Sequence, residues 1–207
     1  AMMRMYEQAL PKAFEGSKYG HRLPIGTIEV IDNFPYQALR DYYEKWYRPD
    51  QQGIVVVGDV DVDKVEAKIK EIFSPIEMPA NAAERVYEKV PDNKEPIITI
   101  AKDKEQPSTM IYIWHKHPAT PNEAKGNIGY LVQNYIFSMI AKMLNARLDE
   151  LRQNANPPYI MAVTEDTDFL LAKTTQAFAG IAVSKEDGIP TAISALVREI
   201  ERARKFG

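Results

Sequence analysis

The sequence of 207 residues contains no cysteine. This absence excludes disulfides, thiolate zinc sites, iron–sulfur clusters and cysteine nucleophiles, and it leaves the cellular compartment open. An excess of positive charge is also missing, because 26 Lys and Arg residues are set against 29 Asp and Glu residues, for a net charge of −3. Binding to nucleic acid requires a basic field, so no nucleic-acid partner is expected.

Long hydrophobic runs are lacking as well. No apolar stretch approaches the roughly 20 residues of a membrane-spanning helix, so no membrane span is expected. The sequence also lacks a phosphate-binding loop, a dinucleotide-binding glycine pattern, a G-x-S-x-G elbow and the two-histidine zinc motifs H-E-x-x-H and H-x-x-E-H. A self-contained catalytic site is therefore hard to assemble from these residues.

The hydrophobic pattern of the remaining residues predicts a mixed fold. Apolar residues spaced three and four apart predict helices at 36–47, 62–73, 123–151 and 189–203. Apolar, β-branched runs predict strands at 53–59, 97–101, 110–114, 159–164 and 175–183. The order of these elements predicts an α+β fold, a two-layer sandwich whose mostly antiparallel sheet carries helices on one face.

Several local expectations follow from this pattern. We expect the 53–59 strand to be buried on both faces, the 97–101 strand to pair with its neighbour, and the last two strands to form an antiparallel pair. Asp61 or Asp63 is expected to cap the 62–73 helix, and Asp187 the final helix. Two sets of side chains are interpreted as packing residues, the first on the sheet and the second in the core: Tyr42, Tyr43, Trp46 and Tyr47, and Met139, Ile140 and Met143.

The candidate metal ligands are few. His115 and His117 are two residues apart at a predicted strand end, so both rings point to one face and would form one edge of a metal site. Zinc needs a third and usually a fourth ligand, and none is indicated nearby, so a solvated strand end is the simpler interpretation. His21 is interpreted as a hydrogen-bonding loop residue. The carboxylates at 59, 61 and 63 are interpreted as turn and helix-cap residues, because no Glu follows at the spacing of a calcium-binding loop.

Three segments in the first third of the chain read Y-G-H-R-L-P-I-G-T at 19–27, W-Y-R-P-D at 46–50 and I-V-V-V-G-D-V-D at 54–61. Together these segments resemble the insulinase/pitrilysin family of zinc metallopeptidases. The family pattern has a "Y-G, P-x-G-T" segment, a helix ending "F/W-Y-x-P-x-N", a "V-V-V-G-D-V" strand and a further helix. The match is strong over residues 19–73, with Asp50 where Asn is usual, and beyond them only the order of elements is similar.

The resemblance implies a domain of an enzyme. In this family the inverted H-x-x-E-H motif and a distant Glu ligand hold zinc in the domain that precedes one of this type. The chain, residues 1–207, is therefore expected to be a single α+β domain excised from a longer polypeptide, with the first Ala as a cloning remnant. Zinc is expected in the parent protein, in a domain absent here, and no cofactor is expected on this chain.

The resemblance also implies two candidate substrate-binding residues. The family has an Arg near the end of the long helix and a Tyr that opens the next strand seven residues later, both of which reach the bound peptide or the transition-state oxygen. Arg152 and Tyr159 occupy these places. Their simpler interpretation is compensation of the helix dipole by Arg152 and edge packing by Tyr159.

The leading hypothesis is a non-metal domain of a zinc metalloendopeptidase, which forms chamber wall and peptide-binding surface. The alternative is a catalytically inactive family member with a structural or assembly role. A third interpretation, an unrelated ligand-binding domain, requires the resemblance to be chance. Expected partners are a peptide or protein substrate, the companion zinc domain, a second half or subunit, and a second copy of the isolated chain. The compartment is unknown, although family likeness suggests the bacterial periplasm or cell envelope.

Overall fold

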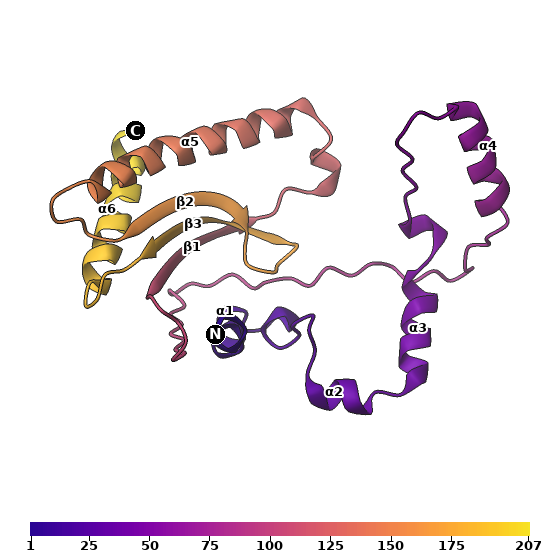
Figure 1. The fold of residues 1–207 in the computed structure, drawn as a ribbon, viewed down its shortest axis with the longest axis horizontal. Helices are drawn as coiled ribbons and strands as arrows, with labels where there is room; N and C mark the ends of the chain where they lie inside the picture. The colour runs from indigo at the N-terminus through magenta and orange to yellow at the C-terminus, as the bar shows by residue number, and fades with distance from the viewer. The chain divides into compact units, whose positions relative to one another are not determined.

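A computed structural model describes residues 1–207 (Figure 1). The chain divides into two compact units, each described here by itself. Unit 1 comprises residues 1–23 and 87–207, and unit 2 comprises residues 24–86. The expectation of a single domain over 1–207 stays a prediction.

Unit 1 contains the sheet. Its strands are β1 (Met110–Pro118), β2 (Met161–Asp168) and β3 (Thr175–Val183), in the order β1-β3-β2. Both pairings are antiparallel, and they place residue 110 of β1 and residue 161 of β2 opposite residue 183 of β3. The predicted antiparallel pair and the 110–114 strand are therefore confirmed, and β1 extends to Pro118. The outer edges of β1 and β2 face no further strand.

Helices α5 (Ile128–Arg152) and α6 (Ile189–Phe206) cover one face of this sheet (Figure 1). The core between these layers consists of six buried side chains: Leu148, Tyr159, Ala182, Ala192, Ala195 and Leu196. Small residues on β3 allow α6 to approach closely, since a Cβ added at Gly180 would lie 3.1 Å from Leu196 Cδ2. The predicted α+β fold with helices packed on one face of an antiparallel sheet is confirmed.

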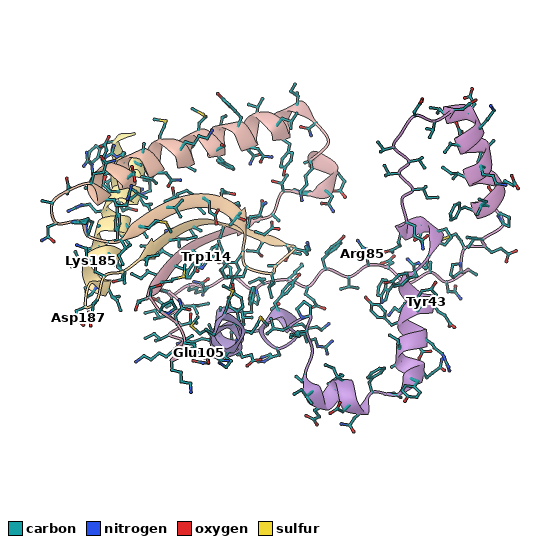
Figure 2. All side chains as sticks on the ribbon, viewed as in Figure 1. Tyr43, Arg85, Glu105, Trp114, Lys185 and Asp187 are labelled. Carbon is teal, nitrogen blue, oxygen red and sulfur yellow. The ribbon has the colours of Figure 1, made fainter.

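The opposite face of the sheet is covered at one end by α1 (Met2–Ala13). Because strand residues alternate between faces, Trp114 points away from α5 while its neighbour Ile113 packs toward the α5 and α6 core. Trp114 meets Phe169 edge to face, with ring centroids 5.7 Å apart, and Phe169 in turn packs against Phe14 at the end of α1. Figure 2 shows Trp114 on this side of the sheet.

Two polar connections fix the C-terminal half of α5. Asn145 bridges to β2, where its Oδ1 accepts from the Thr164 amide at 2.6 Å and its Nδ2 donates to the Thr164 carbonyl at 3.0 Å. Arg147 donates to the buried Glu199 of α6 at 3.1 Å. Polar groups in a core are stable only when they are paired in this way, so these bonds set the position of α5 on the sheet.

Unit 2 consists of helices and irregular segments. Its helices are α2 (Ile28–Asn33), α3 (Tyr36–Trp46) and α4 (Val62–Phe73). The predicted cap at Asp61 is confirmed, because its Oδ1 accepts from the Lys64 amide at 3.2 Å. Arg48 is the one buried side chain of unit 2; its guanidinium donates to the Ala83 carbonyl at 2.9 Å and to both oxygens of Asp50. A short 3-10 turn lies at 49–51 in this unit, and two more lie at 18–20 and 122–124 in unit 1.

Two predicted strands are wrong. Residues 53–59 and 97–101 are irregular and pair with no strand. The 53–59 run is also exposed instead of buried, with 90% of Val57 accessible to solvent, and Ile100 in the second run is 77% accessible. A β-branched run forms a strand only where a neighbour accepts its backbone hydrogen bonds. Neither segment has such a neighbour in this structure.

Three smaller expectations also need correction. Gly188, without a side-chain bond, precedes α6, and Asp187 adopts a left-handed φ of 55° instead of capping it. The long helix begins at Ile128 behind Asn127, whose Oδ1 accepts from the Tyr130 amide at 3.0 Å, so it starts later than predicted. The predicted packing residues are largely exposed, and unit 2 contains no sheet against which the first set could pack. Trp46 is half-buried, and the other members are exposed: Tyr42, Tyr43 and Tyr47, and Met139, Ile140 and Met143.

Candidate functional site

Arg152 is the last residue of α5 and is half exposed. Its Nε donates to Asp149 Oδ1 at 2.7 Å, one turn earlier on the same helix. The hydrogen bonds from Arg152 and Gln153 lower the pKa of Asp149. A cation at this position also interacts favourably with the C-terminal end of the helix dipole. The side chain is therefore positioned at the helix end and remains accessible.

Tyr159, the second predicted substrate-binding residue, is fully buried just before β2. Its hydroxyl donates to the Leu148 carbonyl of α5 at 2.8 Å. Burial raises the pKa of Tyr159 to about 12, and the negative charges of Glu199 and Asp149 add to the effect. Arg152 and Tyr159 thus lie at the two ends of the connection between α5 and β2. Arg152 is accessible, whereas Tyr159 belongs to the core.

The structure pairs His117 with a carboxylate that sequence reasoning missed. His117 Nε2 lies 3.1 Å from Asp166 Oδ2, and Nδ1 lies 3.1 Å from the Pro118 carbonyl oxygen. The register explains the pair, because His117 and Asp166 stand opposite Gln176 and Phe178 on β3 and share the face that α5 covers. The sequence did predict an antiparallel pair of strands at 159–164 and 175–183. The first of these strands was predicted to end at Thr164, two residues before Asp166, so the pair with His117 was not found.

A pocket of about 340 Å³ adjoins this pair between the sheet and α5. Its lining combines polar and apolar side chains from all three strands, α5 and the segment after β1: His117, Pro118, Thr120, Gln133, Phe137, Ile140, Asp166 and Phe178. Unit 2 has a separate hollow of about 440 Å³, lined by Tyr42, Trp46, Tyr47, Gln51, Gln52, Arg85 and Val86. Figure 2 marks Tyr43 and Arg85 in that unit.

No three His, Cys, Asp or Glu side chains gather where they would hold a metal ion. His115 shares a sheet face with His117 by strand alternation. Asp61 is engaged as the α4 cap and in an ion pair with Lys64 at 3.1 Å. His21 directly follows the short turn at 18–20 and is exposed, and its backbone amide donates to the Lys18 carbonyl. None of the helices combines the length and the apolarity needed to cross a bilayer.

Comparison with known families identifies the class of this fold. Residues 33–158 match the family model described as the peptidase M16 inactive domain. The chain belongs to this family, and the insulinase/pitrilysin-type resemblance of residues 19–73 is confirmed.

The relatives that the chain matches carry the names of zinc proteases. The chain is 28% identical over 82% of its length to a "Zinc protease PQQL-like" of Arabidopsis thaliana, and 26% identical over 90% of its length to the "Probable zinc protease PqqL" of Escherichia coli. It spans only about a fifth of these relatives, 18% and 19% of their lengths.

Solved structures of PqqL share the fold. The chain aligns over its full length with the crystal structure of the periplasmic protease PqqL from Escherichia coli, with a TM-score of 0.74 and 22% identity, and covers 22% of that chain. Against the first half of the same protease it aligns over 96% of its length, with a TM-score of 0.72, and covers 42% of that half. In both structures, most of the polypeptide therefore lies outside the part that this chain matches.

Proposed function

We propose that this chain is the non-metal domain of a zinc metalloendopeptidase and that it forms part of the chamber wall and of the peptide-binding surface. The observation that carries the proposal is the match of residues 33–158 to an inactive peptidase domain. The absence of any His, Asp and Glu cluster suited to zinc agrees with a metal site held elsewhere in the parent. The chain alone is proposed to be inactive.

In the parent, zinc bound by the companion domain would polarise a water molecule for attack on a peptide carbonyl. The part proposed for this chain is positional. The outer edges of β1 and β2 carry backbone groups without a strand partner. An extended peptide can add to such an edge through main-chain hydrogen bonds, with little demand on its sequence.

Arg152 and Tyr159 remain proposed substrate contacts with unequal support. Arg152 is accessible, and only an exposed ion pair with Asp149 would have to open for it to reach a peptide. Tyr159 would first have to give up its bond to the Leu148 carbonyl and leave the core. The geometry therefore favours Arg152 over Tyr159 for a role in binding.

The proposed partners are a peptide or protein substrate, the companion zinc domain and a second half or subunit. Their support is the apolar surface of α5, where Ile128, Leu131 and Tyr135 are all more than 60% exposed. Apolar surface of this extent is typical of an interaction face. The same surface would allow two isolated chains to pair. We also propose that residues 1–207 act as one domain in the parent. A periplasmic location is proposed from the description of the Escherichia coli relative.

The test compares the full-length parent with the chain of residues 1–207. We expect about one zinc per parent chain and chelator-sensitive cleavage of a quenched fluorescent peptide, with neither property in the shorter chain. A parent without zinc or activity would replace the peptidase proposal with a structural or assembly role. Zinc and activity in the shorter chain would contradict both.

A further inference from the structure

The pocket beside His117 and Asp166 has a defined chemical character. Phe137, Ile140 and Phe178 supply aromatic and aliphatic surface from α5 and β3. Polar groups come from Gln133, Thr120 and the His117–Asp166 pair. At about 340 Å³ the pocket is at the small end of the range for ligand sites, which suits a single side chain better than a large cofactor.

The hydrogen bonds of the pair leave one acceptor unused. Asp166 Oδ2 receives His117 Nε2, and the other ring nitrogen faces the Pro118 carbonyl oxygen, so the imidazole has no free nitrogen to offer a ligand. Asp166 Oδ1 has no hydrogen-bond partner in the protein. A carboxylate oxygen only accepts, and the matching ligand group is therefore a donor.

We infer that this pocket binds an aromatic side chain that ends in a hydrogen-bond donor, as tyrosine does. The ring packs against Phe137, Ile140 and Phe178, and the hydroxyl donates to Asp166 Oδ1. The choice of a peptide side chain as the ligand rests on the proposed function, whereas the chemistry of the pocket does not. The pocket is separate from the proposed contact at Arg152. Arg152 is the last residue of α5, whereas the pocket is lined by residues of the three strands and of the first half of α5.

The test is an NMR titration of ¹⁵N-labelled chain 1–207 with N-acetyl-tyrosinamide and, separately, with N-acetyl-phenylalaninamide. We expect the tyrosine probe to shift the amides of Thr120 and Gln133 and to bind about tenfold more tightly, since a hydrogen bond to a charged acceptor contributes about that factor. The two probes differ only in the hydroxyl. Asp166→Leu, which removes the acceptor, is expected to bring the ratio of affinities to about one.

A matched pair of helix variants controls for folding. Ile140 lines the pocket and is 47% exposed, whereas Ile136, one turn earlier on α5, is 49% exposed and lies outside the lining. Ile140→Lys should abolish binding of the tyrosine probe, and Ile136→Lys should leave it unchanged. Equal affinities for the two probes, or equal effects of the two lysines, would overturn the inference. Neither readout depends on zinc or cleavage, so a failure here is distinct from a failure of the peptidase proposal.

Discussion

The two units of the chain differ in what they bury. Unit 1 holds every buried apolar side chain of the structure, and most of them form two clusters on opposite faces of one sheet. Unit 2 buries a single side chain, Arg48, which is satisfied by a carbonyl and a carboxylate. Both units form helices with apolar residues at helical spacing, so amphipathic spacing alone does not determine where a core forms.

The interactions that hold the helices also differ between the two units. In unit 1 the face of α6 meets small residues on β3, and Asn145 and Arg147 connect α5 to its neighbours. In unit 2, α4 is capped by Asp61 and carries ion pairs between Lys70 and Glu66 and between Lys68 and Glu71, all of them local. Exposed local bonds of this kind contribute much less to the stability of a core than burial of large apolar side chains does.

The largest expected effect comes from truncating the core of unit 1. Leu196→Ala should destabilise the chain by about 2–5 kcal/mol, because Leu196 is fully buried between α6 and β3. Val57→Ala, on an exposed side chain of unit 2, should change the free energy of unfolding by less than about 0.5 kcal/mol. Denaturant unfolding followed by circular dichroism measures both. Equal losses would show that unit 2 contains a core which the structure does not show.

A smaller difference in stability between the units is expected for glycine substitutions. Gly180→Ala should cost about 1–3 kcal/mol, since the new methyl would lie 3.1 Å from Leu196 Cδ2 and 3.2 Å from Ile200 Cδ1. At Gly53 in unit 2 nothing lies within 4 Å of an added Cβ, so Gly53→Ala should be neutral or slightly stabilising. Thermal unfolding measures the stability of both variants. A Gly180→Ala variant as stable as the wild type would mean that α6 is not held against β3.

A smaller effect is expected at Tyr159, where it depends on pH. Tyr159→Phe should cost about 1 kcal/mol at neutral pH through loss of the bond to the Leu148 carbonyl. Burial raises the pKa of Tyr159 to about 12 from its ordinary value of 10, so the folded state favours the neutral phenol. This contribution is complete below pH 10 and is lost as the pH rises toward 12. Stability of the wild type should therefore fall more steeply than that of Tyr159→Phe between pH 10 and 12.

The smallest effect on stability is expected at Arg152. Its bond to Asp149 is exposed, so Arg152→Ala should cost less than about 1 kcal/mol. In the full-length parent the same variant should lower kcat/KM for a peptide substrate if the proposed contact exists. Lys68→Ala, which removes another exposed ion pair, is the matched control. Unchanged peptide kinetics for both variants would assign Arg152 to the helix end alone.

The sequence predicted the elements that pack against a neighbour better than the segments that do not. Alternating and 3.6-residue patterns located β1, β3, α5 and α6, because these elements bury the faces that the patterns define. The runs at 54–57 and 97–101 have the same composition as buried strands, but pairing requires a partner that composition does not specify. Similarly, Asp61 was predicted as a cap from local spacing, whereas the left-handed backbone at Asp187 was not anticipated.

The candidate sites, too, could be predicted from the sequence only in part. Family likeness selected Arg152 and Tyr159 by position, yet position does not reveal that one is accessible and the other buried. The His117–Asp166 pair joins two strands across β3, a separation of 49 residues that spacing rules do not reach. Long-range register produced this site, and only the strand pairing makes it visible.

Unit 1 holds the buried apolar side chains of the structure, whereas unit 2 buries none of its own. Amide hydrogen exchange of the chain 1–207, followed by mass spectrometry, tests this difference between the units. We expect slow exchange in β3 and fast exchange at residues 54–57. Protection at 54–57 equal to that of β3 in the isolated chain would contradict it.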